Sequence, residues 1–393
     1  MRSMRAPNYK RHQRGFKSRA VPRPNLISGV FRVQPSSRTG LKLGGRYEIV
    51  GLVDHGGSSE VYLARDARTA LLVIVKMLTA EAAMDPQHRE RFIIGARLTM
   101  GIDHPAIARV YGVEVPPNEP PYLIMEALQG ESLADYLDRE KTMSQPMTLA
   151  LAREAASGLV AAHRAGIIHR DIKPGNLYLL GPPGTPYGIK IIDFGLSKDM
   201  RHIGSGPISV NMVLGTAQYM APEQVLADPI DVRTDIYAFG VVLFGMLTGQ
   251  LPFDLKPGAD LFSHQLFSPA PPPSWLMQEV DPRLEQLILR CLRKHPENRY
   301  ASMQALLDDL TTIENNPLTA ASEISVPVLQ HQPDVYVPKG SEGRGVAEDL
   351  ARHFGVEIPP PPTLRMGAEP EDTLDGMGFE SVRERPRNKL SKW

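Results

Sequence analysis

The chain has 393 residues, of which 42% are hydrophobic and 22% are charged, and its formal net charge is zero. This composition is typical of a globular protein with one large or two ordinary domains, and a neutral chain gives no overall argument for nucleic-acid binding. The single cysteine, Cys291, excludes an intrachain disulfide framework and a cysteine-rich metal site. Without an apolar leader or a run of 18 apolar residues, we expect a cytoplasmic protein with no transmembrane segment.

Residues 1–43 form a basic N-terminal arm. Eight arginines and lysines lie within the first 24 residues, and no acidic residue precedes Glu48. Because proline, serine and glycine are frequent and no apolar period is sustained, we predict that the arm is disordered. Such an arm can contact acidic surfaces or nucleic acid. A solvated arm without a partner is an equally good interpretation.

Residues 44–314 carry the folded domain. Strand-like patterns occur at 47–50, 60–64, 71–76, 107–114 and 122–126, and one helical pattern, 86–101, lies among them. After Gly130 the chain turns mainly helical, with candidates at 133–140, 148–165, 235–248, 259–267, 282–294 and 302–314. A strand-rich part (44–126) followed by a helical part (127–314) predicts an α+β protein with two unequal lobes.

Residues 315–393 form a proline-rich tail that includes four consecutive prolines from Pro359 to Pro362. We predict that this tail is mostly disordered, with one short helix at 345–354. The alternative is a ligand for a proline-binding module.

The most informative motifs all belong to phosphoryl-transfer chemistry. In chain order they are His169-Arg170-Asp171-Ile172-Lys173-Pro174-Gly175-Asn176, Asp193-Phe194-Gly195, Gly215-Thr216 and Ala221-Pro222-Glu223. Transfer to a hydroxyl needs a carboxylate for the hydroxyl proton, a cation beside the phosphate and oxygen ligands for Mg²⁺. A lone His-Arg-Asp occurs by chance in many chains, whereas four motifs in this order do not.

With these motifs the chain resembles the eukaryotic-like (Hanks-type) serine/threonine protein kinases of bacteria, from Gly44 to Ile313. The resemblance implies a bilobal protein kinase fold with a small, five-stranded β-rich N-lobe and a larger helical C-lobe. It also implies that the chain transfers the γ-phosphate of ATP to serine or threonine hydroxyls of protein substrates, including itself. The implied cofactors are ATP and Mg²⁺, with Mn²⁺ as an alternative ion.

The resemblance assigns roles to the polar residues of the catalytic loop and to Asp193. Asp171 would be the catalytic base, and Lys173 would contact the γ-phosphate and mark the serine/threonine class. Asn176 and Asp193 would bind the metal. Arg170 suggests a switch by phosphorylation of the activation segment, because a guanidinium can bind a phosphate through two parallel hydrogen bonds.

Other positions carry nucleotide-binding, regulatory and structural roles on the same resemblance. The nucleotide-binding residues would be Val53, Gly56, Gly57, Val61, Lys76, Glu126, Leu128 and Tyr178. Ser205 and Ser209 are candidate phosphorylation sites, with a plain polar loop as the alternative, and Thr216 would contact Asp171 and Lys173. For the structural residues we expect Glu223 to pair with Arg299 and Asp235 to hydrogen-bond the catalytic-loop backbone.

The N-lobe departs from the family pattern around the nucleotide. In this chain, Asp54 and Ser59 replace the first and third glycines of the family's glycine-rich loop. Ile74 and Tyr178 are larger than the residues usual in the family at these positions and add bulk to the adenine pocket. The largest departure is Gly95, which stands where the family has the helix glutamate that pairs with the β3 lysine.

Three explanations of Gly95 remain open at the level of sequence. The alignment of the helix could be shifted, Asp54 could replace the glutamate as the partner of Lys76, or the kinase could be weak or inactive. The alternative function is therefore a pseudokinase that acts as a binding or scaffold module. A small-molecule kinase is disfavoured because Gly215-Thr216 and Ala221-Pro222-Glu223 are typical of a peptide platform.

Overall fold

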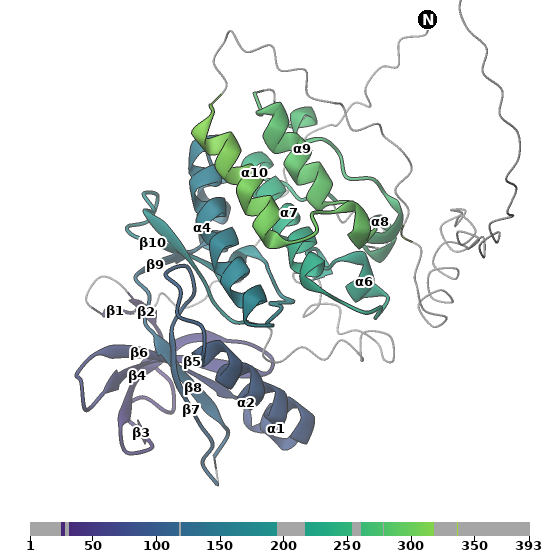
Figure 1. The fold of residues 1–393 in the computed structure, drawn as a ribbon. Helices are drawn as coiled ribbons and strands as arrows, with labels where there is room; N and C mark the ends of the chain where they lie inside the picture. The colour runs from purple at the N-terminus through teal and green to yellow at the C-terminus, as the bar shows by residue number, and fades with distance from the viewer. Residues whose placement is uncertain are drawn as a thin grey trace, which may run out of the picture. The chain divides into compact units, whose positions relative to one another are not determined.

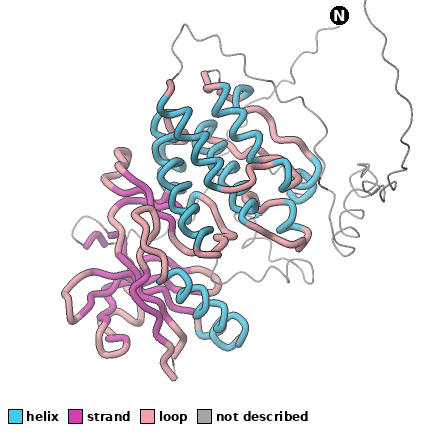
Figure 2. The backbone as a smooth tube through the Cα atoms, viewed as in Figure 1, coloured by secondary structure: helices cyan, strands magenta, loops and turns pink. Residues whose placement is uncertain are grey.

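The computed structural model describes residues 25–27, 31–117, 119–194, 217–253, 261–277, 279–317 and 336. Strands dominate the first part of the chain and helices the second, and only α1 and α2 are helices of the strand-rich lobe (Figures 1 and 2). The two-lobed α+β fold predicted from the sequence is confirmed.

The N-lobe is built on a six-stranded antiparallel sheet with the strand order β3-β4-β5-β6-β8-β7. Its strands are β3 (Lys42–Leu43), β4 (Tyr47–His55), β5 (Ser59–Asp66), β6 (Leu72–Leu78), β7 (Val110–Glu114) and β8 (Tyr122–Glu126). Five strands were predicted. The sixth, β3, has only two residues, which is too short to give a period-two pattern.

Two helices pack against this sheet, and both begin at a side-chain cap. Thr79 accepts a hydrogen bond from the Ala82 amide ahead of α1 (Ala80–Met84), and Asp85 accepts one from the Gln87 amide ahead of α2 (Pro86–Met100). On α2, the buried residues Phe92, Ala96 and Thr99 recur at helical spacing and face the sheet.

Part of the predicted disordered arm is ordered, so that prediction is wrong for residues 31–43. Strand β2 (Phe31–Val33) pairs with β1 (Asn25–Ile27), and Gln34 exchanges two backbone hydrogen bonds with Leu52 of β4 at 2.7 and 2.8 Å. Val33 is buried beside Leu63. Segments of two or three residues carry no sequence period, and they are ordered here by pairing with a longer strand. The basic residues 1–24 lie outside the described part of the chain.

The C-lobe contains α3 (Leu133–Glu140), α4 (Gln145–Arg164), α6 (Pro222–Val225), α7 (Val232–Thr248), α8 (Leu261–Phe267), α9 (Pro282–Cys291) and α10 (Met303–Asn315). It also contains the 3-10 turns η1 (Pro174–Asn176), η3 (Pro273–Trp275) and η4 (Pro296–Asn298). All six helical segments predicted after Gly130 are present, with ends that differ by a few residues. The short helix α6 begins with Pro222 and was not predicted.

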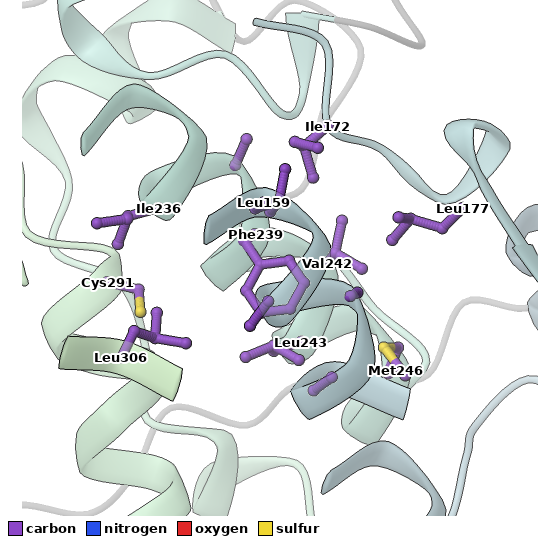
Figure 3. Close-up of a cluster of buried hydrophobic side chains, with 14 of the residues drawn as sticks. Leu159, Ile172, Leu177, Ile236, Phe239, Val242, Leu243, Met246, Cys291 and Leu306 are labelled. Atoms are coloured by element: carbon purple, nitrogen blue, oxygen red, sulfur yellow. The ribbon is translucent and has the colours of Figure 1, made fainter. Parts of the chain in front are cut away.

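Helix α7 is the centre of the C-lobe core. It is apolar on nearly every side, as expected for a helix that other helices surround. Figure 3 shows Phe239 and Leu243 of α7 among Leu159 of α4, Cys291 of α9 and Leu306 of α10. The thiol of Cys291 is buried in this core, and burial raises its pKa.

A small sheet of three strands positions the catalytic segments. Its order is β11-β10-β9, from β9 (Gly130–Ser132), β10 (Leu177–Leu180) and β11 (Gly188–Ile191). The catalytic loop immediately precedes β10, and Asp193 is the second residue after β11.

Of the predicted tail, the structure describes residues 315–317 and Tyr336. The proline run and the predicted helix at 345–354 lie outside the described residues. Among the helices that are described, none combines the length and apolarity needed to span a bilayer.

Candidate active site

The backbone of the catalytic loop is held by a buried carboxylate at the start of α7. Asp235, which is 0% exposed, accepts hydrogen bonds from the amides of His169 and Arg170, both at 2.8 Å. Arg170 has φ 65°, a left-handed conformation that costs a non-glycine residue about 1–2 kcal/mol. The two bonds from Asp235 offset that cost, and they are the contact predicted from the sequence.

His163 of α4 makes a polar contact that the sequence did not predict. In the structure its Nε2 lies 2.8 Å from Asp235 Oδ2, so it is a third hydrogen-bond partner of that carboxylate. A single histidine on the alanine-rich face of α4 was the only signal in the sequence that could have indicated this role.

The imidazole of His169 joins the catalytic loop to the segment that carries Asp193. Its Nδ1 accepts a hydrogen bond from the Asp171 amide at 3.2 Å, which leaves Nε2 to donate to the Ile192 carbonyl at 3.0 Å. Burial lowers the pKa of His169, so the ring is neutral in this arrangement. The ring also lies against Phe194, with centroids 4.7 Å apart.

The carboxylate of Asp171 is oriented by two neighbours from its own loop. Asn176 Nδ2 donates to the main-chain oxygen of Asp171 at 2.7 Å and to its Oδ2 at 3.0 Å. Lys173 Nζ lies 3.1 Å from the same Oδ2. The loop therefore brings together a carboxylate, a cation and an amide, as the resemblance to protein kinases implies.

Lys76 of β6 reaches across to the same region and pairs with Asp193. The distance from its Nζ to Asp193 Oδ1 is 2.8 Å, and the Lys76 side chain is 13% exposed. Asp193 has φ 58°, a second left-handed non-glycine residue in the site. Strained residues of this kind concentrate at functional sites.

The structure decides between the explanations of Gly95. This residue is half-buried and lies one turn from Phe92 and from Thr99, so it is on the face of α2 that meets the sheet, as the sequence alignment required. The acid on α2, Glu90, is exposed. Helix α2 therefore contributes no carboxylate to Lys76.

Asp54 does not replace the missing glutamate. It is exposed in the β4–β5 hairpin, and its side chain accepts a hydrogen bond from the His55 amide at 2.8 Å. The hypothesis that Asp54 is the surrogate partner of Lys76 is therefore wrong for this structure, because Asp193 takes that place.

The predicted nucleotide-binding residues lie on the strands around Lys76. Val53 and Val61 belong to β4 and β5, and Gly56 and Gly57 lie in the turn that joins these strands. Gly56 closes that turn by donating its amide to the Ser59 carbonyl at 2.9 Å. Gly56 is the one glycine of the family pattern that this loop retains, and neither it nor the adjacent Gly57 has a side chain that would cover the backbone of the turn.

The predicted adenine-binding region lies at the end of β8. The Glu126 carboxylate accepts hydrogen bonds from Lys190 Nζ at 2.6 Å and from the Arg109 amide at 2.8 Å. Leu128, two residues further on, packs partly buried on the cluster that contains Met125. These contacts fix the segment whose backbone would meet adenine.

The bulky Tyr178 is held at its hydroxyl. This group donates to the Gly130 carbonyl at 2.9 Å, and burial raises the pKa of Tyr178 to about 12. The phenol is therefore directed towards β9.

A buried ion pair supports the segment after the activation region. Arg299 donates to both oxygens of Glu223, at 2.7 and 2.9 Å, which is the pair predicted from the sequence. Gln224, which the sequence analysis did not single out, donates to the Arg170 carbonyl at 3.1 Å. Ser205, Ser209 and Thr216 lie outside the described residues, so their predicted roles stay predictions.

The lobes, the catalytic loop and the Lys76–Asp193 pair define a protein kinase. A sequence model of the protein kinase domain matches residues 47–310, and the chain belongs to this family. The predicted resemblance to bacterial serine/threonine kinases is confirmed.

Its relatives include serine/threonine-protein kinases of other bacteria. PknB of Mycobacterium tuberculosis is 35% identical over 286 residues, which are 72% of this chain and 45% of that protein. Pkn1 of Myxococcus xanthus is 37% identical over 267 residues, or 68% and 38%. The chain thus spans less than half the length of the curated relatives it matches. Compared with the crystal structure of the Mycobacterium tuberculosis PknI kinase domain, the structure has a TM-score of 0.54 at 23% sequence identity. The match covers 70% of this chain and 99% of the PknI chain and supports the fold.

Proposed function

We propose that the chain is a serine/threonine protein kinase that transfers the γ-phosphate of ATP to protein hydroxyls. The observation that carries this proposal is the catalytic loop, in which Asn176 and Lys173 orient the Asp171 carboxylate. Membership of the protein kinase family adds ATP and a divalent metal as cofactors.

Asp171 would be the base of the reaction. Its carboxylate accepts the proton of the substrate hydroxyl while the hydroxyl oxygen bonds to the γ-phosphorus and the bond from that phosphorus to the bridging oxygen breaks, which releases ADP. Lys173, next to this carboxylate, offsets the negative charge of the transferred group. Both side chains are less than a third exposed, so their charges are only partly screened.

Asn176 and Asp193 are suited to hold the metal. Mg²⁺, like Mn²⁺, prefers oxygen ligands, and these residues offer an amide oxygen and a carboxylate. Asn176 uses its amide nitrogen for both bonds to Asp171, so its oxygen is the atom left for a metal. When bound, the ion would screen the charge of the ATP phosphates.

Lys76 would contact the α- and β-phosphates of ATP and is positioned by Asp193 instead of by a helix glutamate. Because Asp193 is also the proposed metal ligand, the lysine and the metal share one carboxylate. We therefore expect lower activity than in a kinase in which Lys76 has a glutamate of its own.

The proposed substrates are protein serines and threonines, including Ser205 and Ser209 of this chain. Arg170, whose side chain is exposed, offers a guanidinium that could bind phosphate on such a residue. We propose the cytoplasm as the compartment, because ATP is supplied there.

The test is autophosphorylation with labelled ATP and Mg²⁺, comparing the wild type with Asp171→Asn. Loss of the base should reduce labelling by about 100-fold or more. Asp103→Asn is the matched control, because that carboxylate is 86% exposed and should leave labelling unchanged. Labelling of Asp171→Asn within tenfold of the wild type would contradict the proposed base. Nucleotide binding by the wild type without any labelling would favour the scaffold function instead.

A further inference from the structure

Tyr336 lies far along the chain from the folded domain and is nevertheless buried in the C-lobe. It is 2% exposed, and the preceding residue that the structure describes is Pro317. An exposed aromatic residue would be ordinary in a tail of mixed charge and many prolines. A fully buried one needs a socket in the protein that receives it.

The socket is formed by three separate elements of the C-lobe. The Tyr336 hydroxyl donates to Asp228 Oδ2 at 2.8 Å, after α6. The Tyr336 amide donates to the Leu266 carbonyl of α8 at 3.0 Å. The phenol ring stacks on His295, just ahead of η4, with centroids 5.4 Å apart. The hydroxyl and the amide of this buried residue thus both have hydrogen-bond partners.

The hydrogen bond to Asp228 makes the socket specific for tyrosine, beyond the burial of its apolar ring. Asp228 is 8% exposed, and burial together with the bond to this carboxylate raises the pKa of Tyr336. A hydrogen bond to a charged acceptor is typically worth about ten- to a hundredfold in an equilibrium constant. Phenylalanine would fill the same space but would leave the buried carboxylate without this donor.

The socket adjoins the segment that follows the activation region. The Asp228 amide donates to the Glu223 carbonyl at 2.9 Å, and Ala227 between them has φ 54°, a strained left-handed conformation. On the other side, Gln265 of α8 donates to the Gln218 carbonyl at 2.9 Å. Tyr336 therefore bridges α8, at Leu266, and the segment 217–228, at Asp228. This bridge lies next to the direct contact between Gln265 of α8 and Gln218 of the same segment.

We propose that this socket is a docking site for the C-terminal tail of the chain itself, with Tyr336 as the inserted side chain. In the docked state the tail clamps residues 217–228 against α8. The inference is a binding property of the C-lobe and does not depend on catalysis.

Sequence and tether length both suit this occupant. In Val335-Tyr336-Val337-Pro338, the β-branched residues and the proline favour extended backbone. Eighteen residues (318–335) lie between Pro317 and Tyr336, enough for an extended span of roughly 60 Å. A tether of this kind gives an effective concentration of roughly 1 mM, so the site is mostly filled if the dissociation constant for a free tail peptide is below about 1 mM.

Binding of a tail peptide to the full chain tests the proposal. The Tyr336→Ala chain has an empty socket, and a labelled peptide of residues 329–343 should bind it with a dissociation constant below about 1 mM. The wild-type chain should bind the peptide more weakly, because its own tail competes at an effective concentration of about 1 mM: by about twofold if the dissociation constant is about 1 mM and by about tenfold if it is about 0.1 mM. No binding to Tyr336→Ala at several millimolar, or equal binding to both chains, would overturn the proposal.

Two matched changes test the chemistry of the socket. A peptide with phenylalanine in place of Tyr336, and the Asp228→Asn change in the Tyr336→Ala chain, should each weaken binding about tenfold or more. Unchanged affinity in both would refute the assigned hydrogen bond.

A measurement on the wild type needs no variant to fold. The Tyr336 amide should exchange with deuterium more slowly than in the free peptide, because it is bonded to Leu266. Exchange at the rate of the free peptide would overturn the proposal.

Discussion

Glu223→Gln removes the negative charge from an ion pair in which neither side chain reaches solvent. The side chains of Arg299 and Glu223 are 0% and 2% exposed. All five N–H groups of Arg299 have acceptors, because besides Glu223 it donates to the carbonyls of Arg293, Arg233 and Lys294. Thr234 also donates to Glu223, at 2.9 Å.

The variant leaves the guanidinium buried without a counter-charge. Breaking such a pair from one side typically costs about 3–5 kcal/mol. Glutamine keeps one oxygen that can accept from Arg299, so we expect the lower end, about 3 kcal/mol. For a domain of this size that corresponds to a fall in melting temperature of roughly 6–12 °C.

Urea unfolding of the full chain measures this loss, with Glu48→Gln as the control for the same chemical change on the surface. Glu48 is 51% exposed and lies 3.8 Å from Lys42, so solvent screens the pair and its removal should change the free energy of unfolding by less than about 0.5 kcal/mol. If the two variants lowered the free energy of unfolding by the same amount, burial would not be the reason that the Glu223–Arg299 pair stabilises the fold, and the prediction would be refuted.

Two further predictions concern packing and pH. Gly240→Ala on α7 puts a methyl group 2.5 Å from Cys291 Cβ and should lower the free energy of unfolding by about 1–3 kcal/mol. Gly245→Ala on the same helix puts its methyl group 3.7 Å from the nearest atom and should raise the free energy of unfolding by up to about 1 kcal/mol. Shifts of the melting temperature in the same direction for both variants would contradict this description of the packing. Burial lowers the pKa of His169, so near pH 6.5 and below the unfolded chain binds a proton that the folded chain does not bind. The free energy of unfolding should therefore decrease as the pH is lowered from 6.5, by up to about 1.4 kcal/mol per pH unit. Urea titrations between pH 7.5 and 5.5 should give a shallower slope for His169→Gln, and an identical slope would exclude His169 as the cause.

The sequence predicted the C-lobe well because its signals there are local. Apart from the four-residue α6, the helices from α3 to α10 each span enough residues to show a 3.6-residue period, and the catalytic loop is contiguous from His169 to Asn176. The contacts of Asp235 and of Glu223 with Arg299 were also predictable, because the motifs that imply them come with fixed partners.

The remaining features depend on contacts between distant segments. Strands β2 and β3 have two or three residues and are ordered only by pairing, so their own sequence gave no signal. The burial of Tyr336 depends on Asp228, Leu266 and His295, which are separated from it by 41 to 108 residues (336 − 295 and 336 − 228). No period or short motif can reveal such a contact, because its partners lie in three different elements.

The partner of Lys76 shows why a departure from a family pattern does not by itself decide activity. The sequence shows that the glutamate is missing at Gly95, but it does not show which carboxylate is near enough to replace it. In the structure Asp193 is 2.8 Å away, so the lysine keeps an ionic partner and remains directed into the site. The Lys76–Asp193 pair thus keeps the ammonium group beside the catalytic segments, and in the proposed phosphoryl transfer the lysine shares this carboxylate with the metal.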